Sequence, residues 1–172
     1  MVAVFRVIRL VVVCFLLGVA ATQALATQTF VGRVTAVPDG DTLWIVADSG
    51  GKPQKLRLLG IDAPEICQPG GQAARDALLV LVNRQPVQVE VQRNDDYGRG
   101  LARLRVGGQD VGATLVRQGW AWSYRWRRSL GPYAQQEQVA RVARLGVFAS
   151  PSPEQPRDFR KRHGPCGDRA KQ

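Results

Sequence analysis

The sequence has 172 residues and carries 24 Lys and Arg against 14 Asp and Glu, which gives a formal charge of +10. As a soft prior, this length allows one domain with a real hydrophobic core and leaves little room for a second. The positive charge favours a polyanionic partner, either nucleic acid or an anionic membrane surface.

Residues 1–26 have the features of a signal peptide. Arg6 and Arg9 precede an apolar run that is shorter than the roughly 20 apolar residues of a membrane-spanning helix. An Ala-Leu-Ala tripeptide follows, so we expect cleavage after Ala26 and a mature chain that begins near Thr27. The alternative, an uncleaved membrane anchor, is disfavoured by the short run and the cleavage site. We therefore expect an exported protein, periplasmic or secreted, whose charge falls from +10 to +8 with the loss of the two arginines.

Removal of the signal peptide changes the cysteine count, because Cys14 leaves and Cys67 and Cys166 remain. In an exported chain such a pair favours one disulfide, which would tie the loop after Glu65 to the C-terminal segment. In the chain-entropy model this contributes about 4 kcal/mol. Two reduced thiols are the alternative, which an oxidising compartment disfavours. A structural zinc site is excluded, since two cysteines and the single His163 do not supply four ligands.

Strand and helix patterns alternate in the first part of the mature chain. Residues 29–47 are rich in β-branched and aromatic residues and are interrupted by Pro38-Asp39-Gly40, which predicts two strands joined by a turn. Three more strands are predicted at Lys55–Ile61, 86–93 and 100–106. The segment 72–83 predicts a helix, with an apolar stripe of Ala73, Ala77, Leu78 and Leu81.

Two further helices are expected after the last strand. Asp110 is a suitable N-cap for a helix over Val111–Gln118, which Gly119 would end. A third helix starts near Pro132 and stops before Gly146, with an apolar face of Val139, Val142 and Ala143.

The C-terminal segment 150–172 begins with closely spaced prolines and carries many charges, so we expect an irregular tail that Cys166 ties to the domain. The five short strands with a helix before the fourth predict a five-stranded OB-fold barrel with about three helices, an α+β fold. The curved face of such a barrel commonly holds nucleic acid. The predicted organisation is a signal peptide over 1–26, one domain over 27–149 and a Pro- and Arg-rich tail over 150–172.

Four segments resemble the signature blocks of the staphylococcal nuclease, or thermonuclease, family. They are VPDGDTLWI (37–45), LRLLGIDAPE (56–65), DYGRGLA (96–102) and LVRQGWA (115–121). They occur in the order of the family at similar intervals, and the resemblance covers about residues 30–148. The resemblance implies an OB-fold nuclease domain with calcium-dependent endonuclease activity. Members of the family cut DNA and RNA with little sequence specificity and leave 3′-phosphates.

Position by position, the resemblance implies a role for several residues: calcium binding by Asp41, Asp62 and the backbone carbonyl of Ala63, general-base catalysis by Glu65, phosphate binding by Arg57 and Arg99, and nucleotide binding by Tyr97. These roles agree with chemical need, because calcium takes oxygen ligands and the guanidinium fork matches phosphate oxygens. Hydrolysis also needs a base positioned beside a water. The family usually has threonine where this chain has Ala63, which would lower activity if the hydroxyl takes part.

Each of these residues also has an ordinary structural interpretation. Asp39-Gly40-Asp41 is typical of a hairpin turn, and Arg57 could be a solvated strand arginine. Strict strand alternation would even place Arg57 and Asp62, five residues apart, on opposite faces. Both serve one site only if Gly60 marks a bulge or bend.

The segment WAWSYRWRRS (120–129) combines aromatic rings with arginines, a composition suited to stacking bases and contacting phosphates. Trp120 and Trp122 are equally well explained as core residues. Tyr124 and Arg125 are the better candidates for substrate binding, although the offset from the family pattern is ambiguous here. The tail residues Arg157, Arg160, Lys161, Arg162 and His163 are expected to be solvated, adding at most non-specific attraction to phosphates.

The sequence therefore predicts an exported, monomeric, calcium-dependent endonuclease that acts on DNA and RNA and is not inserted in a membrane. The alternative is a catalytically silent OB-fold module that binds nucleic acid. Such a module would not need the carboxylates and arginines together. A basic protein that docks on a membrane is a third possibility, but the sequence lacks a convincing amphipathic helix with a basic face.

Overall fold

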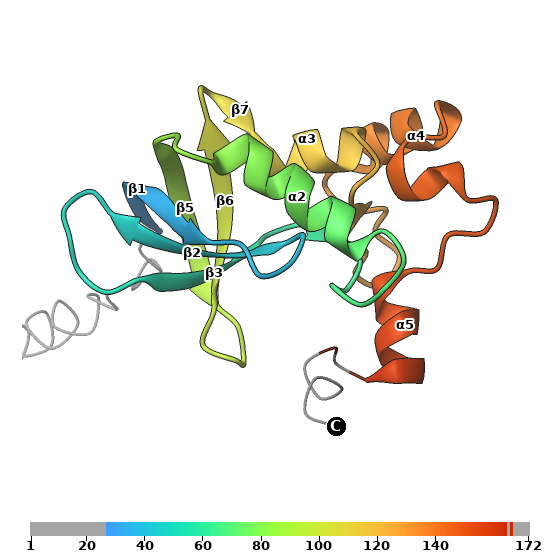
Figure 1. Ribbon diagram of the computed structural model, residues 1–172, viewed down its shortest axis with the longest axis horizontal. Coiled ribbons are helices and arrows are strands. Elements are labelled where there is room, and N and C mark those ends of the chain that lie inside the picture. Colours follow the sequence, from blue (N-terminus) through green and yellow to red (C-terminus); the bar gives the residue numbers. More distant parts are fainter. Residues whose placement is uncertain (1–26, 165, 167–172) are drawn as a thin grey trace, which may run out of the picture.

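Five strands of mixed direction close into a barrel in the computed structural model, which describes residues 27–164 and 166 (Figure 1). The strands are β1 Gln28–Ala36, β2 Thr42–Ala47, β3 Gln54–Leu58, β5 Val87–Asn94 and β6 Gly100–Val106. Antiparallel pairs join β3 to β2, β2 to β1, β1 to β5 and β5 to β6. A parallel pairing of β3 with β6 completes the barrel. The predicted OB-fold barrel is confirmed, whereas the predicted signal peptide lies outside the described residues.

The barrel closes around side chains that alternate along the strands. In β5, Val87, Val89 and Val91 are buried while the residues between them are more exposed, as the period of two predicts. Gly100 lies where β3 and β6 meet, and a Cβ at this position would be 2.8 Å from the Leu56 side chain. The absence of a side chain therefore allows the two strands to approach and close the barrel.

Two helices occur where the sequence predicted them. Helix α2, Gly71–Val82, crosses one side of the barrel (Figure 1) and buries Ala74, Leu78 and Val82. The predicted stripe is wrong at Ala73, which is exposed, because the most buried side of the helix is shifted by one residue toward the C-terminus, to Ala74, Leu78 and Val82. Helix α3, Val111–Arg117, follows the short strand β7, Gln109–Asp110. The Asp110 carboxylate accepts a hydrogen bond from the Ala113 amide at 2.8 Å, which confirms the predicted N-cap.

Helix α4, Ala134–Val142, is present as predicted, but its expected apolar face is wrong. Val139 and Val142 are exposed, and the buried residues are Glu137 and Ala140. The physical reason is that the Glu137 carboxylate accepts hydrogen bonds from segments outside its own turn, including the Ser123 amide at 2.9 Å. These polar contacts decide which side of the helix faces inward. The 3₁₀ helix η1, Gly146–Ala149, follows.

The predicted irregular tail contains a helix, α5, Pro156–His163. Proline in the first turn has a backbone suited to a helix start, and the basic residues of the last turn suit the helix dipole. Phe159 is buried and anchors the helix. Sequence patterns did not reveal α5 because the prolines and charges that surround it are typical of loops.

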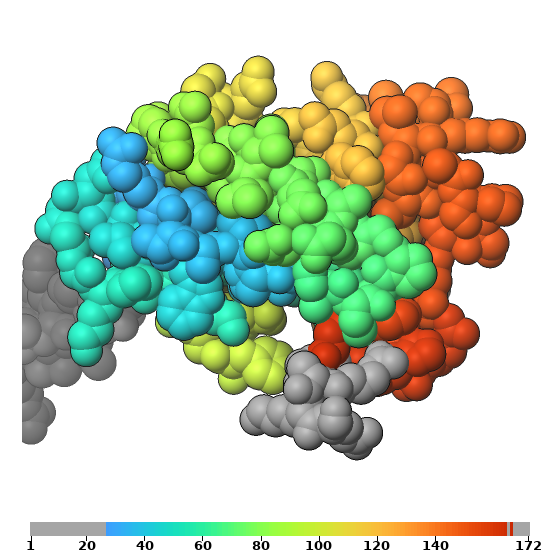
Figure 2. Space-filling view, viewed as in Figure 1, coloured from blue at the N-terminus to red at the C-terminus, as the bar shows by residue number. Residues whose placement is uncertain are grey.

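The tail is joined to the barrel domain beside the start of α2. Cys67 and Cys166 form the disulfide that the sequence favoured, with their Cα atoms 5.7 Å apart. The Gln68 side chain also donates a hydrogen bond to the Glu154 carbonyl at 2.8 Å. Helix α5, in red, accordingly lies against the green segment that leads into α2 (Figure 2). Within the described part of the chain, no helix has the length and apolar character required to cross a membrane.

Candidate active site

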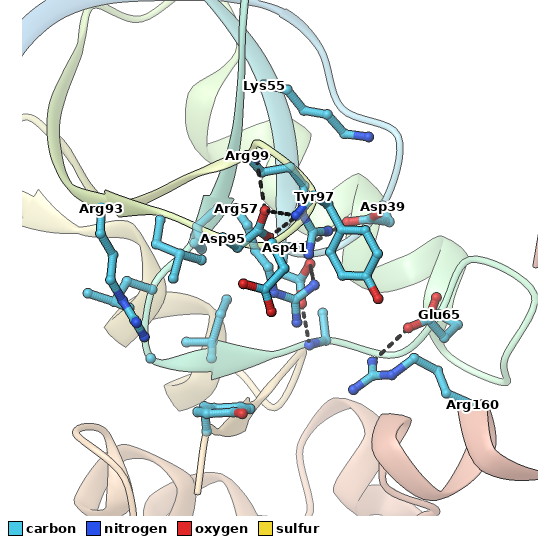
Figure 3. A pocket seen from close by; sticks show the side chains of 18 of the residues that line it. Asp39, Asp41, Lys55, Arg57, Glu65, Arg93, Asp95, Tyr97, Arg99 and Arg160 are labelled. Carbon is cyan, nitrogen blue, oxygen red and sulfur yellow. Dashed lines mark hydrogen bonds and ion pairs between the residues drawn. The ribbon is translucent and has the colours of Figure 1, made fainter. Parts of the chain in front are cut away.

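A pocket of about 650 Å³ opens at one end of the barrel (Figure 3). Its walls come from the end of β3, the turn between β5 and β6, the segment before α2, and α5. The lining residues include most of the predicted site: Asp41, Arg57, Ala63, Glu65, Tyr97, Arg99 and Tyr124. Arg160, which was predicted to be solvated, also lines it.

Gly60 brings Arg57 and Asp62 to the same site. Strand β3 ends at Leu58, and a turn with a φ of +85° at Gly60 separates it from β4, Ile61–Asp62. A positive φ is readily adopted by glycine, and a Cβ here would be 2.6 Å from the Pro132 ring. The predicted bend is confirmed. Strand β4 then leaves the barrel sheet and pairs with β8, Trp122–Ser123.

Arg57 bridges two buried carboxylates. Its Nη1 donates to Asp41 Oδ1 at 2.8 Å, and its Nη2 donates to Asp62 Oδ1 at 2.9 Å. Burial raises the pKa of Asp41, against the lowering effect of the adjacent guanidinium. Burial alone would lower the pKa of Arg57, but the two aspartates raise it. The arginine is therefore held charged between two acids rather than solvated on a strand.

The turn that carries Asp41 is packed rather than exposed. The Asp41 amide donates a hydrogen bond to the Asp39 carboxylate at 3.1 Å, and Asp41 Oδ2 accepts from the Ala63 amide at 3.1 Å. A Cβ on Gly40 would lie 2.8 Å from both Ala63 and Ala74. Only glycine allows this turn to sit between the Ala63 segment and α2, so the turn has a closer fit than an ordinary surface hairpin.

Glu65 follows Pro64 on the segment that leads into α2. The Glu65 amide donates to Gln68 Oε1 at 3.2 Å, and the Gln68 amide donates to the Glu65 carbonyl at 2.8 Å. These bonds and the fixed φ of Pro64 hold the backbone of Glu65. The side chain keeps 23% of its surface exposed at the pocket, so it is accessible to a water and a substrate.

Arg99 is oriented by the turn between β5 and β6. The Asp95 carboxylate accepts from the backbone amides of Tyr97 and Arg99 and from Arg99 Nε, the last at 2.7 Å. Partial burial raises the pKa of Asp95, but the hydrogen bonds from Arg99 and Tyr97 outweigh this effect and the net pKa is lowered. The guanidinium also lies 5.4 Å from the centre of the Tyr97 ring, which is 85% exposed.

The segment 120–129 divides between the core and the pocket. Trp122 is buried and packs edge-on against Phe148, and Trp120 is partly buried against the barrel core. Tyr124 lines the pocket. Arg125 does not line it, because its guanidinium donates to the buried Glu137 at 2.9 Å.

Arg160 is the site residue that sequence reasoning missed. Its guanidinium donates to Glu65 Oε1 at 2.7 Å and to both oxygens of Asp62 at 3.2 Å (Figure 3 shows the Glu65 contact). The sequence could have indicated that Arg160 lies near Glu65. Cys166 is six residues beyond Arg160, and its disulfide partner Cys67 is two residues beyond Glu65. The disulfide therefore already limited how far Arg160 could lie from Glu65.

The chemistry of the site suits a hard cation with few protein ligands. Asp41 and Asp62 present carboxylate oxygens beside the Ala63 backbone, and oxygen is the ligand atom that calcium prefers. Across residues 27–164 and 166, no cluster of three or more His, Cys, Asp or Glu side chains suited to a metal is found. A cation here would complete its coordination with backbone, water and substrate oxygens.

Comparison with known proteins shows where this architecture occurs. Residues 55–150 match the model of the family described as staphylococcal nuclease homologue. The chain is 36% identical over 141 residues to Protein ParB of Escherichia coli, which covers 76% of this chain and 78% of that protein. It is 34% identical over 147 residues to a micrococcal nuclease of Shigella flexneri, covering 79% and 83%. An uncharacterized endonuclease of Haemophilus influenzae is 34% identical over 129 residues, covering 75% and 72%.

Proposed function

Because this chain belongs to the staphylococcal nuclease family, we propose that it is a calcium-dependent endonuclease. It hydrolyses phosphodiester bonds of DNA and RNA with little sequence specificity and leaves 3′-phosphates. Membership of the family supports a nuclease. The dependence on calcium, the DNA and RNA substrates and the 3′-phosphate products are what we propose in addition.

One observation carries the proposal. The carboxylates of Asp41 and Glu65 and the guanidinium groups of Arg57 and Arg99 come from separate segments and line one pocket, and Asp62 is bound to the Arg57 of that lining. Burying charged groups is costly unless they are paired. Their collection at one accessible end of the barrel is therefore better explained by chemistry on a charged substrate than by stability.

The proposed mechanism assigns one task to each group. Glu65 takes a proton from a water, which attacks the phosphorus and expels the 5′-oxygen. Arg57 and Arg99 bind the phosphate oxygens and stabilise the negative charge that develops on them. Asp41, Asp62 and the Ala63 carbonyl would hold calcium, which polarises the phosphate when bound.

The nucleotide on either side of the scissile bond would meet aromatic rings. Tyr97 and Tyr124 both lie at the pocket and are 85% and 44% exposed. Stacking on exposed rings is tolerant of sequence, because every base presents a π-face. This agrees with a nuclease of low sequence specificity.

The proposed setting is outside the cytoplasm, and the proposed form is a monomer. The features of residues 1–26 support export, and a disulfide between Cys67 and Cys166 agrees with an oxidising compartment.

The test is cleavage by the purified protein, expressed from the full sequence, of single-stranded and double-stranded DNA and of RNA. We expect cutting with calcium, none with a chelator, and a loss of about 10²-fold or more for Glu65→Gln, since general bases commonly contribute that much. Products should carry 3′-phosphates. Binding of nucleic acid without cleavage under every condition would instead support the silent OB-fold module.

A further inference from the structure

Arg160 reaches the proposed active site from outside the part of the chain that matches the family. The match ends at residue 150, whereas Arg160 is on α5, Pro156–His163. Its partners Asp62 and Glu65 are 98 and 95 residues earlier in the sequence. The C-terminal segment thus adds a cation to a site that is otherwise built by the barrel domain.

The contacts of Arg160 join two acids with one planar group. Nη1 donates to Glu65 Oε1 at 2.7 Å and to Asp62 Oδ1 at 3.2 Å, while Nη2 donates to Asp62 Oδ2 at 3.2 Å. Desolvation lowers the pKa of Arg160, but the hydrogen bonds and charges of Asp62 and Glu65 outweigh it and raise the pKa. The group therefore remains a cation, and its fixed fork sets the angle between the two carboxylates.

Three independent contacts hold α5 in this place. The Cys67–Cys166 disulfide closes the far end, Gln68 binds the Glu154 carbonyl ahead of the helix, and Phe159 is buried beneath it. Other cations of this helix contact acids of their own segment: Lys161 pairs with Asp158, and Arg162 pairs with Glu154. Among the basic residues of α5 that the structure describes, Arg160 is the residue that contacts Asp62 and Glu65.

We propose that Arg160 is a positioning residue of this site: it orients the Glu65 carboxylate against Asp62, and α5 with its disulfide delivers it. The inference rests on the proposed function of Glu65 as the base. A base that is held at one angle spends less time in unproductive rotamers, so positioning should raise the rate of the chemical step more than substrate affinity.

The contact itself is tested without measuring activity, by a double-mutant cycle in urea unfolding. The variants are Arg160→Gln, Glu65→Gln and the double variant, with Arg157→Gln paired with Glu65→Gln as the control. Arg157 is an exposed arginine on the same helix. We expect the Arg160 and Glu65 shifts in the unfolding midpoint to be non-additive and the control pair to be additive. Additive shifts for both pairs would overturn the inference, whatever the activity.

The positioning role is tested by cleavage kinetics of the same variants. For Arg160→Gln we expect kcat to fall by about tenfold or more with KM changed by less than about threefold. Arg157→Gln should stay within about twofold of the wild type in both parameters. Arg160→Lys should recover only part of kcat, because an ammonium lacks the planar fork. A change confined to KM, or full recovery with lysine, would contradict a positioning role.

A calcium titration by calorimetry separates this role from obstruction. If Arg160 merely occupies the place of the cation on Asp62, Arg160→Gln will bind calcium about tenfold more tightly and cut faster, which would overturn the inference. We expect calcium affinity that is not improved. A wild-type protein that shows the Arg160–Glu65 coupling but never cuts would refute the proposed function and the positioning role together, while leaving the contact established.

Discussion

Arg57 and Asp41 form an ion pair that is almost fully removed from solvent, with 2.8 Å between Nη1 and Oδ1 and side-chain exposures of 18% and 5%. Because Arg57 also holds Asp62, replacing it leaves the buried Asp41 carboxylate without its cation and leaves Asp62 paired, among the described residues, with Arg160 alone. We expect Arg57→Gln to lower the free energy of unfolding by about 3 kcal/mol. The measurement is urea unfolding at neutral pH.

The matched control for Arg57 is Arg33, whose pairing with Asp48 is exposed and has an N–O distance of 3.9 Å. Arg33→Gln should cost less than about 0.5 kcal/mol, since exposed pairs contribute little. Equal losses in the two variants would show that the Arg57 network does not stabilise the fold as the geometry indicates.

We expect the Asp95 carboxylate to make the free energy of unfolding decrease as the pH falls into the acid range. Its pKa in the folded protein is below the ordinary value of 3.8, so the unfolded chain takes up a proton first as the pH falls. The contribution of Asp95 is therefore complete above that ordinary value and is lost as the pH drops through the folded-state pKa. We expect Asp95→Asn to cost about 1 kcal/mol at pH 7, with the difference from wild type shrinking toward pH 3.

The control for Asp95 is its exposed neighbour Asp96. Asp96→Asn should unfold like the wild type at every pH, because the Asp96 side chain is exposed to solvent. If the difference in free energy of unfolding between the wild type and Asp95→Asn stays constant from pH 7 to pH 3, protonation of Asp95 is not linked to stability as expected.

The Cys67–Cys166 disulfide closes a loop with a sequence separation of 99 residues. Replacing both cysteines with serine should destabilise the protein by about 4 kcal/mol in the chain-entropy model. If the disulfide also delivers Arg160, the double serine variant should show the same kcat loss as Arg160→Gln under folding conditions. Wild-type kcat in that variant would mean that Phe159 and Gln68 hold α5 without the covalent link.

Glu137 is a buried acid on α4 that accepts from the Ser123 amide at 2.9 Å, from Arg125 at 2.9 Å and from Arg141 at 2.8 Å. Truncation removes the acceptor of a buried amide, so we expect Glu137→Ala to cost about 2 to 3 kcal/mol. The exposed neighbour Gln138 provides the comparison, since Gln138→Ala should change the unfolding midpoint little. A small effect of Glu137→Ala would show that water replaces the carboxylate.

Local patterns in the sequence were sufficient for the barrel, and the resemblance to the staphylococcal nuclease family pointed to most of the predicted residues that line the pocket. The alternation in 86–93 and the turn residues around Gly40 and Gly60 report directly on strands and bends, because they depend on neighbours in the chain. The expected bend at Gly60 followed from counting residues between Arg57 and Asp62, and the positive φ confirms it. The pairing of Cys67 with Cys166 followed from the number of cysteines that remain if the predicted signal peptide is removed.

Tertiary structure decided the features that depend on distant partners. Periodicity predicted Val139 and Val142 inside, yet Glu137 is buried because three donors from separate segments or turns converge on it. Arg125 carries the right chemistry for a substrate contact, but it pairs with that same acid. Arg160 looked like one charge among several in a proline-rich tail. Its place beside Glu65 arises because a covalent link, a buried Phe159 and two acids bring segments some 95 residues apart together, and no local pattern records such contacts.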